Sequence, residues 1–520
     1  MLPASHQPGS SGPRREVTAP LAPPRADRVR PARPREGLAP AAGTAVRPGA
    51  VRVPGGGIHP LTDTARNRAL HAYESRVKEA FDCIVPTLRR ISALQHEGAF
   101  EAMAQDIARE RLGFELPGTI LADAWVDQLD MRRLYAWCVF ETYRRFAADF
   151  FHADPLGGRD GAGFQAALQE CGFHALDVTP CADGRLAHVV SYVLRLPFGA
   201  VRRKSYAGAM FDIEENVAKW VETELMRFRG GRPNTADAPT RYLKMVVYHY
   251  STSDPFHEGC AAHGSDTAAA ARAGLERLEN FQRAIQNGFC CGASVDLLLV
   301  GMDTDSDAIR VHVPDAKGNI SLERPLDAAD IYRATLGLPM AEARQHIFEA
   351  VRSHAPGGVD GGMARFIGLL VEHNISQIDY VRENHGGAYT DIGHRERFIG
   401  VGIGFEEIQL RNLTYFAYLD TLEEGAPNMD VGVKIFQGLN TAHGLPIPVV
   451  VRFDYHGAVP GARQRATARC ARVSAAIGER YPRLVDAGLL HLLTMVRDCD
   501  GREPPEPQSC TVLGMAVESH

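Results

Sequence analysis

The feature that most constrains this chain is the position of three metal-ligand residues relative to its predicted strands. Cys181 follows directly after a short predicted strand, 175–179. His249 lies near the end of a second predicted strand, 242–250, and Cys260 comes eleven residues after it. Helical patterns separate the strands, which predicts a parallel sheet covered by helices. Because ligands collect at the carboxyl ends of parallel strands, the fold and the spacing predict one shared site.

The types of these residues indicate a zinc site. Two thiolates and one imidazole are a preferred zinc set, and three protein ligands leave one tetrahedral position open for water. Structural zinc sites are usually closed, so the missing fourth ligand favours catalysis. Asp183 and Arg185 follow Cys181 at alternate positions, where a carboxylate can lie beside the metal and a guanidinium can hold it. The sequence therefore predicts one catalytic Zn²⁺ per chain.

Histidines near the predicted ligands leave two questions open. His257 and His263 flank Cys260 and permit an alternative ligand set, although two loop histidines would close the open metal position. The same two residues, and His188 shortly after the Cys-x-Asp-x-Arg motif, are candidates for the group that passes a proton to solvent. Each is more often a surface or packing histidine, and the sequence does not choose among them.

Length and composition set broader limits. A chain of 520 residues exceeds what one hydrophobic core serves, which predicts two or three domains. Its formal charge of -6 predicts no general affinity for nucleic acid. No apolar run reaches the roughly 18 residues needed to cross a bilayer. The N-terminus lacks the apolar stretch of a secretory signal, so we expect the ten cysteines to be reduced thiols or ligands inside a cell.

Residues 1–57 differ in composition from the rest of the chain. They hold eleven of the 32 prolines, no aromatic residue, and nine arginines against three acidic residues. Such a segment cannot bury enough apolar surface to offset its chain entropy, so we expect a disordered, basic, Pro/Arg-rich tail. The tail can be a solvated linker, or its spaced arginines can dock onto an acidic protein surface. Both interpretations stay open.

Three folded regions are expected after this tail. Apolar residues at three- and four-residue spacing predict a helical domain over 58–152, with Pro86 kinking or dividing its first long helix. Strand and helix patterns alternate over 153–397, the predicted zinc catalytic domain, where 186–196 has the pattern of a helix. The C-terminal region, 398–520, has predicted strands at 398–405, 413–419, 431–436 and 449–455 and a predicted helix at 461–481. The fold class is α/β, or α+β over the whole chain.

The metal-ligand motifs also resemble those of a known family. The Cys-x-Asp-x-Arg motif, the long gap to His249 and the ten-residue gap to Cys260 occur within the stretches CADGRLAHVVSYVLRLP and YHYSTSDPFHEGCAAHGSD. These stretches resemble the carboxysomal shell carbonic anhydrases, the epsilon class, which is a divergent relative of the beta class. Beta enzymes share the motif but place the later cysteine close behind the histidine, so the wider gap favours the carboxysomal branch. The resemblance runs from the helical domain to the C-terminus.

The resemblance implies a role for each of these residues. It implies that Cys181, His249 and Cys260 bind zinc in a beta-carbonic-anhydrase-like domain. Asp183 would accept a hydrogen bond from the zinc-bound hydroxide, and Arg185 would hold Asp183 in place. The C-terminal domain would be related to the catalytic one but without metal.

The resemblance also implies a reaction and a location. The reaction would be the reversible hydration of CO2 to bicarbonate, supplying CO2 to Rubisco inside the bacterial carboxysome. The Arg-rich tail would bind Rubisco or a shell protein. The chain would form a homodimer or a higher homo-oligomer.

Other functional classes are weaker candidates. The alternative is a carboxysome assembly or scaffold protein with a structural zinc and a cargo-binding basic tail. A structural zinc predicts that Asp183→Ala retains zinc and loses nothing measurable, which separates the two hypotheses. A zinc deaminase would carry paired Pro-Cys-x-x-Cys and His-x-Glu patterns, which this chain lacks.

Two further patterns are interpreted as having no chemical role. Asp303, Asp305 and Asp307 alternate after a strand but lack the glycine and distal glutamate of a calcium loop, so a solvated turn is favoured. The stretch 499–502, Cys-Asp-Gly-Arg, is one residue short of the Cys-x-Asp-x-Arg motif. We interpret it as a coincidence, because the lost residue would change the direction of the Asp side chain.

Overall fold

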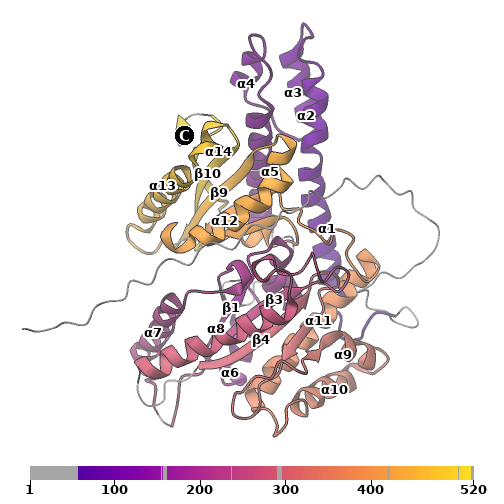
Figure 1. Ribbon diagram of the computed structural model, residues 1–520, viewed down its shortest axis with the longest axis vertical. Helices are drawn as coiled ribbons and strands as arrows, with labels where there is room; N and C mark the ends of the chain where they lie inside the picture. The colour runs from indigo at the N-terminus through magenta and orange to yellow at the C-terminus, as the bar shows by residue number, and fades with distance from the viewer. Residues whose placement is uncertain are drawn as a thin grey trace, which may run out of the picture. The chain divides into compact units, whose positions relative to one another are not determined.

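The computed structural model describes residues 57–153, 155, 161–198, 200–235, 237–289, 295–417, 422–501, 503–513 and 515–516. The predicted tail, 1–57, therefore lies outside the described residues apart from its last position. The described part is a mixed α/β fold with two sheets and a set of N-terminal helices (Figure 1). This agrees with the α/β class predicted from the sequence. Within these residues, no helix is both long enough and apolar enough to span a membrane.

The first helices form the helical region that the apolar spacing predicts. They are α1 (Thr64–Asp82), α2 (Ile84–Ser92), α3 (Phe100–Arg111), α4 (Gly118–Asp123) and α5 (Met131–Ala153). The predicted long helix is divided at Cys83, and Pro86 stands in the first turn of α2, where its missing N–H would have no partner within the helix. These helices share a core with the second sheet, where the rings of Tyr143 and Phe398 lie 5.3 Å apart.

The first sheet carries the predicted ligand residues. Its strands are β1 (Ala175–Pro180), β2 (Arg202–Arg203), β3 (Tyr242–Tyr250), β4 (Val295–Asp303), β5 (Ile309–His312) and β6 (Leu326–Asp327). Their order is β2-β1-β3-β4-β5-β6; the first four are parallel, and β5 and β6 are antiparallel to their neighbours. The predicted strands 175–179 and 242–250 correspond to β1 and β3, which pair directly.

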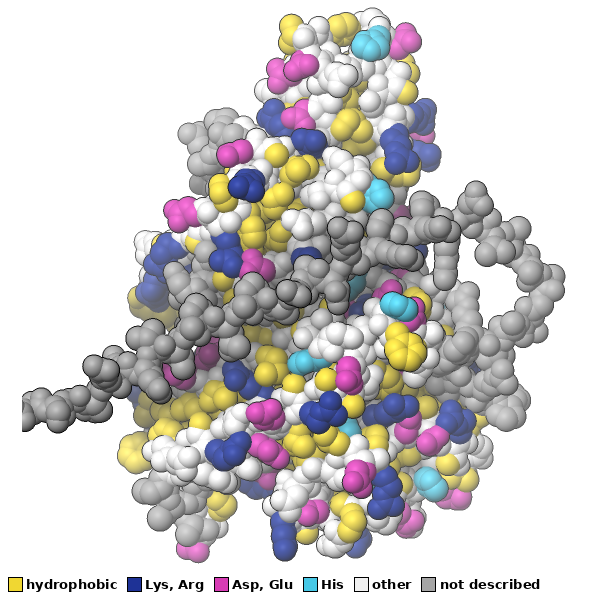
Figure 2. Space-filling view, viewed as in Figure 1, with side chains coloured by type: hydrophobic (Ala, Val, Ile, Leu, Met, Phe, Trp, Pro, Cys, Tyr) yellow, Lys and Arg dark blue, Asp and Glu magenta, His cyan; other side chains and the backbone are white. Residues whose placement is uncertain are grey.

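Helices cover and connect the strands of this sheet. They are α6 (Gly161–Glu170), α7 (Ile213–Arg229), α8 (Thr267–Gly288), α9 (Ala328–Thr335), α10 (Met340–Arg352) and α11 (Gly361–His385). The side chain of Asp266 caps α8 by accepting a hydrogen bond from the Ala269 N–H, and α8 packs on β3 and β4 (Figure 1). On the face shown in Figure 2, positive and negative side chains are interspersed over these helices.

The helix predicted at 186–196 is wrong. The segment instead forms a short 3-10 turn at Gly184–Leu186 and a π-helical turn at Val189–Val193. In the π-helical turn a backbone hydrogen bond spans five residues, from the Leu194 N–H to the Val189 carbonyl, whereas an α-helical bond spans four. Such wide turns often occur at functional sites.

The second sheet follows in the C-terminal part of the chain. Its strands are β7 (Phe398–Ile403), β8 (Thr414–Ala417), β9 (Ile447–Tyr455), β10 (Leu490–Asp498), β11 (Glu506–Cys510) and β12 (Met515–Ala516). Its helices are α12 (Leu422–Leu439), α13 (Ala462–Arg480) and α14 (Pro482–Asp486). The strand order is β12-β11-β10-β9-β7-β8.

One predicted strand of this region is helical. The apolar run 431–436 lies inside α12, where Met429, Val433 and Phe436 are buried at helical spacing on one face. A short apolar run fits a strand and a buried helix equally well, because its periodicity is too short to separate them. Because β7 pairs directly with β9, no strand from this segment lies between them.

The two sheets have the same topology. When β1, β2 and β3 are matched with β7, β8 and β9, both sheets have four neighbouring parallel strands followed by two antiparallel ones. The helices correspond as well, since α8 packs on β3 and β4 and α13 packs on β9 and β10. The second sheet is therefore an internal repeat of the first, as expected for a C-terminal domain related to the catalytic one.

Candidate metal centre

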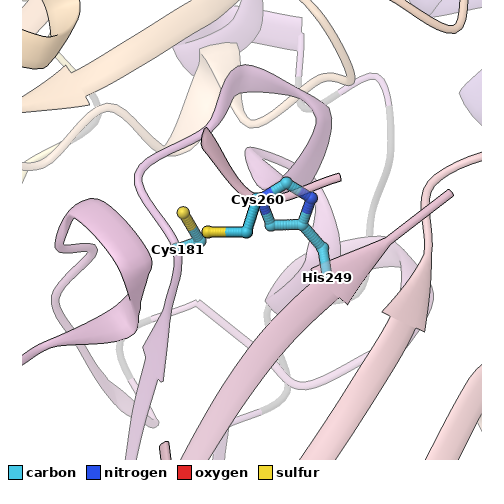
Figure 3. Close-up of side chains that lie close together, drawn as sticks. All are labelled: Cys181, His249 and Cys260. Carbon is cyan, nitrogen blue, oxygen red and sulfur yellow. The ribbon is translucent and has the colours of Figure 1, made fainter. Parts of the chain in front are cut away.

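The structure brings the three predicted metal ligands together at the carboxyl edge of the first sheet. Cys181 is the first residue after β1, His249 is the eighth residue of β3, and Cys260 precedes a 3-10 turn at Ala261–His263. Their ligand atoms all lie within 4.8 Å of one another, and all three residues are buried. Figure 3 shows the three side chains converging on one point. The edge of the sheet is the one predicted from the strand ends.

The residues at this point fit a metal ion. His249 is fully buried, yet neither of its ring nitrogens has a hydrogen-bond partner, which is costly for an imidazole unless another group binds it. A hydrogen bond with Cys260, together with burial, raises the pKa of the Cys181 thiol, and the same bond lowers the pKa of Cys260. Two cysteine sulfurs and one imidazole are donors that zinc prefers, and a divalent cation favours both thiolates.

Asp183 and Arg185 form an ion pair beside the ligands. Arg185 donates from Nε to Asp183 Oδ1 at 2.9 Å and from Nη2 to Oδ2 at 2.7 Å. Burial opposes ionisation of Asp183, but Arg185 and His394 outweigh it and hold the pKa of the carboxyl well below its usual range. Asp183 Oδ2 lies 3.5 Å from Nε2 of His249. A fixed carboxylate therefore lies at the edge of the candidate metal centre.

Comparison with known proteins identifies the family. The models of carboxysome shell carbonic anhydrase match residues 59–151 (N-terminal), 163–394 (catalytic domain) and 395–512 (C-terminal). The carboxysome shell carbonic anhydrase of Prochlorococcus marinus (strain MIT 9313) is 56% identical over 91% of this chain and 93% of its own length. The chain belongs to the carboxysome shell carbonic anhydrase family. The resemblance found in the sequence is therefore confirmed.

Other relatives extend this family membership beyond one group of organisms. The carboxysome shell carbonic anhydrase of Parasynechococcus marenigrum (strain WH8102) is 56% identical over 89% of this chain and 80% of its own length. That of Halothiobacillus neapolitanus is 45% identical over 86% of this chain and 89% of its own length. This chain is thus a carbonic anhydrase by family, with the catalytic-domain match covering all three candidate ligands.

Sequence reasoning missed two residues beside the candidate metal centre, His394 and Glu396. His394 Nε2 lies 3.9 Å from Asp183 Oδ2, and its Nδ1 lies 2.9 Å from Glu396 Oε1. Although burial opposes it, Glu396 and Asp183 raise the pKa of His394 to about 9. Glu396 also accepts the Gly184 N–H at 3.1 Å. These residues lie in a segment without periodicity, more than 200 positions from the motif, so no local signal could find them.

The proton-acceptor candidates lie in different surroundings. His188 is buried, and its Nε2 lies 2.7 Å from the carboxylate of Asp307. The side chain of His257 is 79% exposed and pairs with Asp254. His263 is partly buried. Among the described residues, neither His257 nor His263 joins a group that could hold a metal ion, which favours the ligand set with His249.

The prediction of a solvated turn at Asp303, Asp305 and Asp307 is wrong. Their exposed fractions are 3%, 0% and 0%. Asp305 accepts the Ser253 N–H at 2.6 Å, and Asp303 accepts the Thr252 hydroxyl at 3.0 Å. The hydrogen-bond donors come from another part of the chain, the loop after β3. The alternating aspartates by themselves therefore gave no sign that their side chains are buried. These bonds anchor the start of the loop that leads to the last ligand.

Proposed function

We propose that this carbonic anhydrase interconverts CO2 and bicarbonate at one zinc ion held by Cys181, His249 and Cys260. The observation that carries the proposal is the buried convergence of these three donors beside the Asp183–Arg185 pair, with no hydrogen bond to either nitrogen of His249. Zinc, when bound, supplies the Lewis acidity that lets a water molecule lose its proton near neutral pH. Two thiolates offset the charge of the ion, so the surrounding residues have to orient the reactants.

The chain's own residues supply that orientation. Arg185 holds both oxygens of Asp183, so the carboxylate keeps one rotamer and stays ionised. A fixed carboxylate can accept a hydrogen bond from the attacking water and turn its lone pair toward CO2. Because Arg185 occupies Asp183, the carboxylate is not free to take the open position at the metal. Asp183 and Arg185 are therefore the proposed catalytic residues.

His394, whose pKa of about 9 suits proton transfer at alkaline pH, is the proposed route for the released proton. Its side chain is 23% exposed, and its Nε2 lies 3.9 Å from Asp183, so it connects the pair with solvent. Replacing His394 with Ala should lower the turnover number, and imidazole buffer should restore part of it. If imidazole restores nothing while zinc is retained, His394 does not carry the proton.

The Asp183→Ala variant tests the central proposal. We expect it to retain one zinc per chain, measured by metal analysis, and to lose about 100-fold in CO2 hydration measured by stopped flow. Cys181→Ser should lose both zinc and activity. Unchanged activity in Asp183→Ala would instead favour the alternative, an assembly protein with a structural zinc.

The location and partners follow from the family name and the tail. We propose that the enzyme works in the carboxysome and supplies CO2 to Rubisco, and that residues 1–57 bind Rubisco or a shell protein. The net positive charge of this segment supports docking on an acidic surface. Deleting residues 1–57 should abolish encapsulation and spare activity. If the truncated enzyme still co-purifies with carboxysomes, the tail is not the tether.

Two structural expectations remain proposals. We propose functional regions at 1–57 (tail), 58–152 (helical), 153–397 (zinc-binding) and 398–520 (metal-free), which limited proteolysis can test at their junctions. We also propose that the chain forms a homodimer or a higher homo-oligomer. Light scattering of the purified full-length chain measures that state directly.

A further inference from the structure

The catalytic pair is contacted by a connecting segment, residues 391–396, which precedes β7. The carbonyl of Ile392 accepts a hydrogen bond from Arg185 Nη1 at 2.9 Å. Glu396 accepts the Gly184 N–H at 3.1 Å. The position of this segment therefore determines where Arg185 and the turn between the two catalytic residues lie.

The connecting segment is held in turn by two residues that precede β8, Arg411 and Asn412. Arg411 donates from Nη1 to Asp391 Oδ1 at 2.8 Å and from Nη2 to the Asp391 carbonyl at 3.0 Å. Asn412 donates from Nδ2 to the Gly393 carbonyl at 3.0 Å. Its own N–H donates to the Gly184 carbonyl at 2.9 Å. Both backbone groups of Gly184 are thus bonded to residues outside the catalytic sheet.

Arg411 is fixed tightly enough to act as a clamp. Only 1% of its side chain is exposed, and its guanidinium lies 4.0 Å from the centre of the Tyr389 ring. It also donates to the Thr304 carbonyl at 3.1 Å, which ties the segment to the turn after β4. A planar guanidinium with bonds in several directions and an aromatic ring beneath it loses little entropy on binding, unlike a lysine.

We infer that Arg411 is a positioning residue for CO2 hydration, acting through residues 391–396 on Arg185 and Asp183. The inference rests on the proposed function of that pair. Arg411 touches no reacting atom; it sets the place of the Ile392 carbonyl and, through it, the direction of the Arg185 guanidinium. In this way the metal-free half of the chain takes part in the reaction.

Arg411→Met tests the inference, because methionine keeps much of the volume and removes the hydrogen bonds. We expect kcat to fall about 10- to 100-fold, with KM for CO2 and one zinc per chain unchanged. Hydrogen exchange of the amides in 182–186 and 390–397 should become faster, a readout that needs no activity. If Arg411→Met leaves both kcat and the hydrogen-exchange rates of these amides unchanged, the inference is overturned.

A matched control is Arg452→Met. Arg452 is equally buried and pairs with Glu407 and Asp454, but it makes no bond to the connecting segment. We expect it to lower stability while leaving kcat per zinc and the exchange of 182–186 unchanged. A loss of kcat in Arg452→Met equal to that in Arg411→Met would overturn the inference.

If Arg411→Met does not fold, Asp391→Asn replaces it, because this change weakens the same ion pair at a partly exposed carboxylate.

A double variant separates this inference from the proposed function. If Arg411 acts through Asp183, then adding Arg411→Met to the Asp183→Ala variant should lower kcat by a further factor of less than about two. A further loss of kcat as large as that of Arg411→Met by itself would mean that Arg411 acts by another route. That result would overturn this inference but leave the proposed function standing. Full activity in Asp183→Ala would contradict the proposed function instead.

Discussion

The two sheets of this protein have one topology but different strand ends. In the first half, Cys181 follows β1, and the eighth residue of β3 is His249. In the second half, the residue after β7 is Gly404, and the eighth residue of β9 is Asp454. Among the described residues of 398–520, no group of side chains could hold a metal ion. The chemistry therefore depends on a few side chains at one edge, and the shared fold does not determine it.

Asp454 forms an ion pair at the position equivalent to the proposed ligand His249. It accepts from Arg452 Nε at 2.6 Å and from Nη2 at 2.8 Å, and Arg452 also donates to Glu407 at 2.8 Å. Arg452 is fully buried, and these carboxylates outweigh the opposing effect of burial and raise its pKa well above the usual value. The loop after the strand differs too, because only the first half has the longer loop that carries Cys260. The second half thus retains the scaffold and uses the same edge for an ion pair.

The largest expected effect comes from replacing each of the two equivalent residues, His249 and Asp454, with asparagine. His249→Asn should lose zinc and reduce CO2 hydration to background, because it removes one of three proposed ligands. Asp454→Asn should retain zinc and kcat but lower the free energy of unfolding by about 3–5 kcal/mol, because it breaks a buried ion pair. Metal analysis, stopped-flow assays and urea unfolding measure the three quantities. Loss of zinc in Asp454→Asn would contradict the comparison.

A smaller effect is expected from the two glycines at these edges. A Cβ on Gly184 would lie 2.5 Å from Glu396, and a Cβ on Gly404, whose φ is +120°, would lie 2.5 Å from Asp454. Gly184→Ala should lower kcat about tenfold with zinc retained, because Glu396 has to move away from the catalytic turn. Gly404→Ala should lower stability by about 1–3 kcal/mol and leave kcat unchanged. An equal loss of kcat in Gly184→Ala and Gly404→Ala would show that the two halves of the chain are coupled more closely than their contacts indicate.

The smallest expected effect is a change in pH dependence. Burial and the charge of Asp305 raise the pKa of Asp303 to about 7. The folded protein therefore binds a proton that the unfolded chain releases near pH 4, so this stabilisation is lost as the pH rises toward and through 7. Asp303→Asn should flatten the dependence of the free energy of unfolding on pH between pH 4 and 8.

The corresponding residue of the second half gives the control for this titration. Asp498 ends β10 as Asp303 ends β4, but it is only partly buried. Asp498→Asn should leave the slope of the free energy of unfolding against pH close to that of the unmodified chain. A slope unchanged in Asp303→Asn would mean that another group binds the proton.

Local sequence signals predicted the elements that bring the ligands together. The predicted strands 175–179 and 242–250 lie just before Cys181 and around His249, and both are confirmed as β1 and β3. The wrong elements, 186–196 and 431–436, are short apolar runs whose conformation depends on neighbours far along the chain. The first contacts Asp307 through His188, and the second packs against β8 and β9.

The sequence by itself predicted the candidate donor set and the strand ends that carry it, and it determined the family, because these depend on local motifs and on residue types near the ends of recognisable strands. Only the tertiary structure decided that His394 and Glu396 lie beside Asp183 and that Arg411 bonds to Asp391 in the same connecting segment. It also decided that the aspartates after β4 are buried. The physical reason is that hydrogen bonds between residues hundreds of positions apart leave no periodic trace in the chain, and form only once both sheets are folded.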